Sequence, residues 1–287
     1  MTGNFDEKIC PELLFRTIIE PKLNDKKATY AWDDKAFFDR YLPSVPFPKT
    51  IVRNVWGGGI TGDEFNPITF EEAITIVKND FPVIIKPSRD SGLGRNISKI
   101  VTSDNIEATL RKYDKDYVIQ KTIELCPELK TISPNSVCVM RIITAIIDEK
   151  PVVLSACLRL NTEDDAVADN QITEDGKGML VIGITREGTL KKQGVYSCGQ
   201  QISKLLNGTE FFGIKIPKYE EVLNMVMKAH LQMPMFKAVG WDITIDEDYK
   251  PIVIEYNLKG MGIYYYQLVN GPLFGKYTNS ILNLIKE

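Results

Sequence analysis

The feature that most constrains this chain is a pair of apolar segments near its C-terminus. Residues 239–246 and 251–257 are rich in valine and isoleucine, and the connection 247–250 between them is polar. Such an arrangement is typical of a β-hairpin, in which the strands are antiparallel and their side chains alternate between two faces. The sequence therefore predicts an antiparallel sheet that contains this hairpin.

The register of the predicted hairpin brings acidic side chains together. A turn centred on the polar connection pairs Asp246 with Pro251 and, counting back along both strands, Asp242 with Glu255. Directly opposed side chains have Cβ atoms about 4.5 to 5.5 Å apart. Strand alternation also puts Asn257 on the face of Glu255. Two carboxylates and an amide are thus expected at one place on the sheet.

Opposed carboxylates destabilise a hairpin unless a cation offsets their charge. Oxygen ligands of this kind suit Mg²⁺ that is shared with phosphate groups. The alternative is a solvated hairpin face that holds no ligand. The other face is predicted to be core, and it carries Trp241, Ile243, Ile245, Ile252 and Ile254.

Composition limits the partners. The chain has 287 residues, of which 44% are hydrophobic, and its net charge is −3, so it is a globular protein for which nucleic acid is not an expected partner. No apolar stretch approaches the roughly 20 residues of a membrane span. The N-terminus lacks the layout of a signal peptide, which predicts a cytoplasmic protein. A homodimer is left open.

Histidine and cysteine chemistry is poorly supported. The five cysteines are scattered without a C-x-x-C spacing and are interpreted as buried thiols. The one histidine, His230, falls in a predicted amphipathic helix, where a structural role is favoured. Any chemistry is therefore expected to depend on carboxylates, lysines, arginines and amides.

The order of elements predicts an α+β fold with three parts. These are an N-terminal helical segment at 1–48, a small α+β unit at 49–122 and a larger unit at 123–287. Helices are expected at 6–20, from an N-cap at Asp33 to Tyr41, at 69–79 with a Thr69–Glu72 capping box, and at 219–233. Strands are expected at 49–55, 83–86, 95–101, 117–121, 136–147, 152–160 and 179–185.

Three basic residues interrupt otherwise apolar strands. Lys86 ends one of them beside a loop that contains Ser91, Gly92 and Gly94. Glycines let backbone N–H groups approach an anion, and a neighbouring lysine supplies charge for a triphosphate. An ordinary hairpin turn is the alternative for the glycines. Arg141 and Arg159 predict either a bound anion or internal salt bridges.

In this order, the features resemble the ATP-grasp superfamily over residues 30–262. The resemblance is carried by DK at 34–35, PFP at 46–48, FPVIIKP at 81–87, SGLG at 91–94, YVIQK at 117–121, GWDI at 240–243 and IEYN at 254–257. The runs VCVMRIIT at 137–144, LRL at 158–160 and DN at 169–170 look most like the sugar-transfer-associated branch, which is linked to surface polysaccharide biosynthesis. The resemblance implies two α+β subdomains with antiparallel sheets that grip ATP between them.

The resemblance also implies roles for particular residues. Lys35 and Lys86 would contact phosphates, and the loop with Ser91, Gly92 and Gly94 would close over them. The hinge with Gln120, Lys121 and Ile123 would read the adenine, and Glu124 or Glu128 would bind the ribose. Asp242, Glu255 and Asn257 would hold Mg²⁺, while Arg141 or Arg159 would steady the transferred phosphoryl group.

The activity implied is an ATP-dependent ligase that activates a carboxylate as an acyl phosphate for attack by an amine or a related nucleophile. Sugar acids, amino acids and amines are the substrate classes expected. Two alternatives stay open, a phosphotransferase of the same fold and a non-catalytic nucleotide-binding protein. The segment 171–178 departs from the glycine pair of the sugar-associated branch, and the N-terminal part is short, so acceptor contacts are not carried over.

Overall fold

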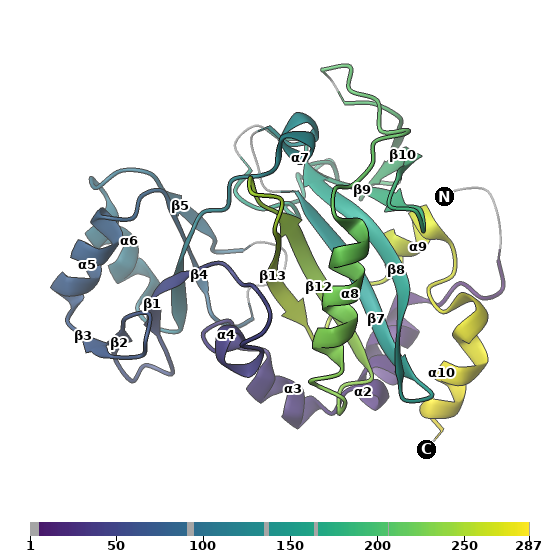
Figure 1. The fold of residues 1–287 in the computed structure, drawn as a ribbon, viewed down its shortest axis with the longest axis horizontal. Helices are drawn as coiled ribbons and strands as arrows, with labels where there is room; N and C mark the ends of the chain where they lie inside the picture. The colour runs from purple at the N-terminus through teal and green to yellow at the C-terminus, as the bar shows by residue number, and fades with distance from the viewer. Residues whose placement is uncertain (1–5, 91–94, 135–137, 164–165, 206, 287) are drawn as a thin grey trace.

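The computed structural model describes residues 6–90, 95–134, 138–163, 166–205 and 207–286. Two antiparallel sheets dominate this part of the chain, and helices cover them (Figure 1). The α+β fold predicted from the sequence is therefore confirmed. None of the helices in these ranges has the length and apolar character that crossing a bilayer requires.

The small sheet lies at one end of the molecule (Figure 1). Its strand order is β3-β2-β1-β6-β4-β5. The helices α5 (Phe70–Lys78) and α6 (Ile106–Tyr113) contribute Ala73, Val77, Ile106 and Leu110 to the core beneath it. The strand bounds are β1 (Thr50–Asn54), β2 (Ile60–Thr61), β3 (Pro67–Ile68), β4 (Val83–Pro87), β5 (Ser98–Ile100) and β6 (Tyr117–Lys121). The predicted capping box, Thr69 with Glu72, begins α5.

The large sheet has the order β11-β10-β9-β8-β7-β12-β13. Its central strands are buried on both faces, which explains why their sequences are nearly continuous apolar runs. The bounds are β7 (Val139–Ile147), β8 (Lys150–Asn161), β9 (Met179–Ile184), β10 (Leu190–Tyr196), β11 (Gln201–Ile202), β12 (Ala238–Ile245) and β13 (Pro251–Asn257). The helix α7 (Pro127–Ile132) links the two sheets.

Helices pack on both faces of the large sheet. The helix α8 (Tyr219–His230) crosses one face (Figure 1), where Val222 and Val226 join a core with Trp241. A second core lies on the other face, against α9 (Tyr264–Asn270), η3 (Gly275–Tyr277) and α10 (Thr278–Leu284). Successive residues of β7 alternate between the two cores, so Arg141 falls on the α9 side.

The N-terminal segment differs from the prediction. Helical structure begins at Glu12 and runs through α1 (Glu12–Leu14), the π-helical η1 (Phe15–Ile19) and α2 (Glu20–Leu23). It then continues in α3 (Lys26–Trp32) and α4 (Phe38–Tyr41). The expected N-cap at Asp33 is wrong, because Asp25 caps α3 and Asp33 ends it. Side chains such as Phe15 and Phe38 pack into the two cores of the large sheet.

The hairpin of β12 and β13 pairs Asp242 with Glu255, as predicted, but by another route. Near the turn, Ile245 pairs with Pro251, one residue away from the expected partner Asp246. A β-bulge between Asp242 and Ile243 then restores the predicted pair, because Ile254 is the extra residue on β13. The bulge also changes the core face.

Because of that bulge, Val253 and Tyr256 are buried in the core, whereas Ile252 and Ile254 are partly exposed. The assignment of these two isoleucines to the core was therefore wrong. Other expected elements differ at their ends: the strand at 95–101 is only Ser98–Ile100, and the helix at 219–233 ends at His230. The strands β10 and β11 were not predicted.

Candidate functional site

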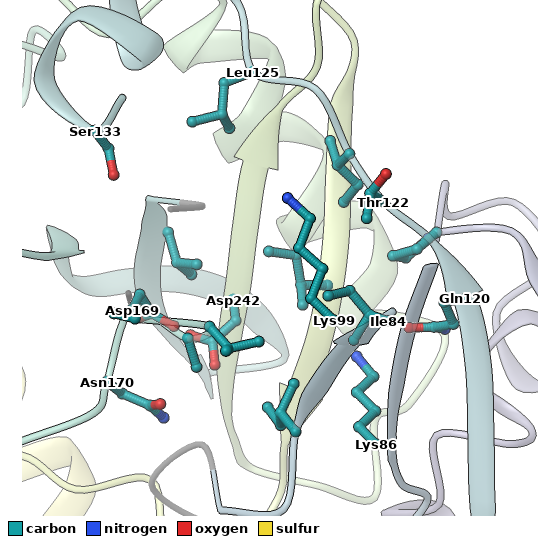
Figure 2. Close-up of a pocket in the computed structure, with 18 of the residues that line it drawn as sticks. Ile84, Lys86, Lys99, Gln120, Thr122, Leu125, Ser133, Asp169, Asn170 and Asp242 are labelled. Atoms are coloured by element: carbon teal, nitrogen blue, oxygen red, sulfur yellow. The ribbon is translucent and has the colours of Figure 1, made fainter. Parts of the chain in front are cut away.

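A cavity of about 210 Å³ lies between the two sheets (Figure 2). The small sheet contributes Ile84 and Lys86 from β4 and Lys99 from β5, and the chain that leaves β6 adds residues 120–125. The large sheet and the connection from β8 to β9 contribute charged and amide side chains, namely Arg159, Asp169, Asn170, Asp242 and Glu255. Predicted residues from distant parts of the chain thus meet at one place.

Lys86 is 5% exposed at the end of β4. Burial lowers the pKa of its amine to about 8, and the nearby Lys35 acts in the same direction, while Glu255 opposes both. Figure 2 shows its side chain extending into the cavity beside that of Lys99. Lys86 makes no ion pair with any residue that the structure describes, and a buried lysine of this kind favours an anionic ligand.

Lys35 lies at the back of the same site. Its backbone N–H donates to the carbonyl of Ser88 at 2.9 Å, which ties it to the end of β4. Its amine is 3.4 Å from Glu255 Oε2. Burial acts to lower the pKa of Lys35, but Glu255 and Asp33 outweigh it, so the pKa is raised and the amine stays charged.

Asp242 is buried between the two predicted arginines. Arg141 donates to both of its carboxylate oxygens, at 2.5 and 2.7 Å, and Arg159 Nη2 lies 3.0 Å from Oδ1. Burial acts to raise the pKa of Asp242, but these guanidiniums hold it at about 2. Asn257 Nδ2 is 3.3 Å from Asp242 Oδ2, which completes the predicted cluster on the hairpin.

The two arginines occupy different positions. Arg159 lines the cavity, where its Nε also donates to Asp169 at 2.7 Å and its Nη1 to the Tyr266 hydroxyl at 3.1 Å. Arg141 is fully engaged behind Asp242, because its Nη1 donates to the Met261 carbonyl at 2.8 Å. Both arginines therefore make internal salt bridges, and Arg159 is the one that reaches the cavity wall.

Two neighbouring polar residues, Asp169 and Asn170, also line the cavity. Burial raises the pKa of Asp169 to about 6 against the opposing effect of Arg159. Asn170 Oδ1 is buried without a hydrogen-bond partner in the described part of the chain. A buried acceptor of this kind is costly unless a ligand or water satisfies it. In the sequence, this pair stands out only as part of a family motif.

The predicted hinge lies along one wall of the cavity. Gln120 is buried and its Nε2 donates to Thr50 Oγ1 at 3.0 Å. Lys121 is paired with Asp80, and Ile123 lines the cavity. The Gln120 side chain is thus bonded within the small sheet, and the backbone N–H groups of Lys121 and Thr122 donate to the carbonyls of Lys49 and Pro82.

The two candidate ribose acids are separated by the structure. Glu124 lines the cavity, with Lys130 Nζ at 3.4 Å from its carboxylate. Glu128 lies further along α7, where its carboxylate accepts a hydrogen bond from the Tyr249 hydroxyl at 3.3 Å. Of the two, only Glu124 is among the residues that line the cavity.

The predicted loop residues and two further lysines complete the comparison with the sequence. Ser91, Gly92 and Gly94 lie outside the described residues. Lys99 and Lys130 line the cavity but were missed. Lysines at exposed strand and helix positions are common, so only their placement by the fold singles them out.

The donor set at the hairpin fits a magnesium ion. Asp242 and Glu255 are paired across the hairpin and both line the cavity, and both are hard oxygen donors of the kind that Mg²⁺ prefers. Within the described ranges, no group of three His, Cys, Asp or Glu side chains is placed to hold a metal. A magnesium ion here would therefore need further oxygens from a phosphate ligand.

Comparison with known proteins agrees with this geometry. The family model described as "Sugar-transfer associated ATP-grasp" matches residues 14–282. A search of curated protein sequences finds no match.

Solved structures of the same fold are distant in sequence. The biotin carboxylase domain of Hydrogenobacter thermophilus 2-oxoglutarate carboxylase, solved with MgADP and bicarbonate, has a TM-score of 0.52 at 15% identity, over 89% of this chain and 46% of that one. The ATP-grasp ligase PsnB, solved with a minimal precursor, has a TM-score of 0.51 at 15% identity, over 91% and 64%.

Carboxyaminoimidazole ribonucleotide synthase from Aspergillus clavatus, complexed with ATP, has a TM-score of 0.51 at 12% identity, over 88% of this chain and 53% of that one. The present chain thus spans less than two thirds of each of these structures. At such identities the likeness establishes the fold. With a family model that covers most of its length, the chain belongs to the sugar-transfer associated ATP-grasp family.

Proposed function

We propose that this protein is a magnesium- and ATP-dependent ligase that joins a small carboxylate to an amine or a related nucleophile. The observation that carries the proposal is the acidic pair Asp242 and Glu255, which faces the buried Lys86 across the cavity between the sheets. Cations on one side and paired carboxylates on the other suit a metal-bound triphosphate.

Each side of the cavity has a part in this proposal. Lys86 and Lys35 bind phosphate oxygens, and the backbone of residues 120–123 reads the adenine edge. Glu124 replaces Glu128 as the proposed ribose ligand. Asp242, Glu255 and Asn257 hold Mg²⁺, which supplies charge neutralisation at the phosphates. The division predicted from the sequence, at 1–48, 49–122 and 123–287, is proposed to separate the N-terminal segment, the nucleotide lid and the metal-binding unit.

The proposed reaction has two displacements. A substrate carboxylate oxygen attacks the γ-phosphorus, the bond to the bridging oxygen breaks, and ADP leaves with the electron pair. The nucleophile then attacks the acyl carbon, phosphate leaves, and the proton released by an amine goes to solvent. Arg159 lies where it can stabilise charge on the transferred group. Arg141 fixes Asp242 instead, so Arg159 is the proposed catalytic arginine of the two.

Asn170 is the proposed contact for the acceptor. Its buried, unsatisfied Oδ1 is suited to accept a hydrogen bond from a substrate hydroxyl or amine. The family description motivates the narrower proposal of a role in surface polysaccharide or sugar-conjugate biosynthesis, with a sugar acid or amino acid as substrate. A cytoplasmic location and a homodimer belong to the same proposal.

The test is to trap the acyl phosphate. The protein is incubated with MgATP, hydroxylamine and a panel of uronic acids and amino acids, and hydroxamate is measured by mass spectrometry. A carboxylate that gives ATP-dependent hydroxamate supports a ligase. Arg159→Ala should reduce the hydroxamate far more than it reduces ATP affinity, whereas the exposed Arg111→Ala should change neither.

The same experiment distinguishes the two alternatives. A phosphotransferase would release a stable phosphorylated product that hydroxylamine leaves intact. A nucleotide-binding protein without activity would bind ATP and yield neither product with any substrate of the panel. Either result would contradict the ligase assignment.

A further inference from the structure

A second cavity lies on the far side of the large sheet from the nucleotide lid. Its volume is about 540 Å³, and the residues that line it are all different from those of the first cavity. The residues that line it come from β8, the end of β9, the starts of β10 and α8, and the segment that joins α9 to α10. Figure 1 shows where these elements lie in the fold.

The cavity exists because two neighbouring strands differ in length. The strand β8 begins at Lys150, but β9 pairs with it only from Cys157 onward. The outer edge of the first half of β8 thus borders the cavity. Asn270 covers part of this edge, because its Nδ2 donates to Ser155 Oγ at 3.0 Å and to the Ala156 carbonyl at 2.8 Å.

Three cationic side chains line this cavity, namely Arg186, Lys191 and Lys276, and no Asp or Glu is among its lining residues. None of the three makes an ion pair within the described parts of the chain. Glu187 follows Arg186 and interacts with it electrostatically, but it is fully exposed and its carboxylate accepts a hydrogen bond from Thr185. A chain with net charge −3 thus gathers unpaired cations at one place.

Lys191 is the most enclosed of the three. Burial lowers the pKa of its amine, and its Nζ donates to the Val269 carbonyl at 2.9 Å. Gly183 lies directly beneath it: a Cβ there would come within 2.8 Å of Lys191 Cδ and 2.5 Å of Asn270 Oδ1. The lysine and the amide therefore occupy space that only a glycine leaves free, so the cavity floor is a packed structure.

The remaining wall is aromatic and apolar. Tyr219, Phe274 and Tyr277 line it, and Lys276 Nζ lies 5.0 Å from the centre of the Tyr277 ring. The volume falls within the roughly 300 to 1,000 Å³ typical of small-molecule sites, where apolar and aromatic walls surround a few polar groups. Cations select an anionic ligand, while aromatic faces and amide or hydroxyl groups suit a hydroxylated ring.

We propose that this second cavity binds an anionic, hydroxyl-bearing small molecule, whose charged group is a carboxylate or a phosphate. The site is independent of the proposed ligase activity, because it shares no residue with the nucleotide cavity. Lys191 contacts the anion from the cavity floor, and Arg186 and Lys276 contact it from the rim.

The test is calorimetric titration of the full chain, saturated with MgADP, with four compounds: glucuronate, glucose 6-phosphate, glucose and inorganic phosphate. Binding of one or both sugar anions, with glucose and phosphate at least about ten-fold weaker, supports the site and identifies the charged group. If inorganic phosphate binds as tightly as the sugar anions, the proposal that the hydroxyl groups are recognised is wrong. No sugar-anion binding up to about 10 mM would overturn the proposal.

Variants then locate the binding. Lys191→Met should weaken the sugar anion on the order of ten-fold to a hundred-fold, whereas Lys192→Met, the same change on the exposed neighbour, should not. Arg186→Gln removes an exposed charge without disturbing the packed floor, and it should also weaken binding. It therefore tests the site even if Lys191→Met fails to fold. Unchanged affinity in both Lys191→Met and Arg186→Gln would contradict the placement, as would competition by ATP.

Discussion

At the scale of single residues, the site is defined by buried charges whose pKa values differ from their ordinary ranges. Lys86 and Asp242 face one cavity, yet their pKa values shift for different reasons. Desolvation lowers that of the lysine, whereas two guanidiniums outweigh desolvation at the aspartate. Lys86 therefore has too little negative charge around it to offset its burial, whereas Asp242 has two guanidinium counterions. A triphosphate would supply what the lysine lacks.

Lys86→Ala is expected to weaken ATP binding about ten-fold to a hundred-fold, because a charge-assisted contact in a desolvated site contributes about 1.5 to 3 kcal/mol. The wild-type amine is charged below its pKa of about 8, so ATP affinity should hold below that pH and decline above it. Titration calorimetry between pH 7 and 9.5 measures both effects. Lys86→Arg, which stays charged, should lose the decline. A decline that persists in Lys86→Arg would assign it to another group.

Glu255→Gln should abolish turnover at ordinary Mg²⁺ with a smaller loss of stability than Asp242→Asn, because the Glu255 side chain is 23% exposed and Asp33 still offsets the charge of Lys35. Asp242→Asn is expected to abolish turnover as well, but also to destabilise the fold by about 3 to 5 kcal/mol. Two buried guanidiniums would then lose their shared counterion. Turnover assays and urea unfolding separate the two effects. Near-normal turnover in Glu255→Gln would remove it from the metal site.

His230 has the structural role that was predicted. It is fully buried, its Nδ1 accepts from the Thr144 hydroxyl at 2.7 Å, and its Nε2 donates to the Phe236 carbonyl at 2.9 Å. Burial lowers its pKa to about 4, despite the opposing effect of the Phe236 carbonyl. The folded protein therefore keeps this histidine neutral.

A pH dependence of stability follows from this. The unfolded chain binds a proton at His230 below about pH 6.5 and the folded chain does not, so this contribution is complete above pH 6.5 and is lost as the pH falls toward 4. The loss is about 3 kcal/mol. Asp33 and Asp169, whose pKa values are raised to about 6, act in the opposite direction. Unfolding free energies of wild type and His230→Gln, compared from pH 7 to 4, isolate the effect. If the unfolding free energies of the two proteins change in parallel between pH 7 and 4, the effect does not come from His230.

At the scale of elements, the N-terminal helices hold the loop that follows the metal-binding strand. Glu20 on α2 is buried, and its carboxylate accepts from the backbone N–H groups of Gly260 at 2.8 Å and Met261 at 3.0 Å. The Met261 carbonyl in turn accepts from Arg141, which holds Asp242. A helix distant in sequence thus fixes the orientation of a site arginine.

Glu20→Gln should lower the free energy of unfolding by about 1 to 3 kcal/mol, because the amide can accept one of the two hydrogen bonds but its NH₂ opposes the other N–H. Through Arg141 it should also lower kcat more than it changes the KM for ATP. Denaturant titration and steady-state kinetics measure these, with the exposed Glu7→Gln as the matched control. A drop in stability without a change in kcat would show that Glu20 only supports the fold.

At the scale of the whole molecule, the N-terminal segment joins the two sheets. Phe38 of α4 packs in a core of the large sheet, while Arg53 of β1 donates to the Ala36 carbonyl at 2.9 Å and pairs with Asp39. A few surface ion pairs, such as Lys259 with Asp90 at 3.1 Å, also join the two units, and exposed pairs contribute little to stability. A nucleotide that touches both sheets would add a further link between them.

Saturation with MgATP at about a hundred times its Kd should raise the free energy of unfolding by about 2.7 kcal/mol. The rise should be seen for both units, and Glu255→Gln should reduce it at the same total concentration. Thermal unfolding monitored by backbone amide hydrogen exchange reports on each sheet separately. Protection confined to one sheet would contradict binding between the two.

The sequence determined the local chemistry of this protein by itself. Alternation along residues 239–257 predicted the hairpin and the Asp242–Glu255 pair, the apolar run before Lys86 predicted its strand, and Thr69 with Glu72 predicted a helix start. These features depend on side-chain periodicity and short-range hydrogen bonds, which a sequence displays directly.

Only the tertiary structure decided which polar residues share a site. The bulge at Ile254, the placement of Glu124 at the cavity, the position of Arg159 at the cavity wall and the support of Arg141 by Glu20 all depend on contacts between residues far apart in the chain. Such contacts are set by how the sheets and helices pack, and packing is a property of the assembled fold that no local pattern encodes.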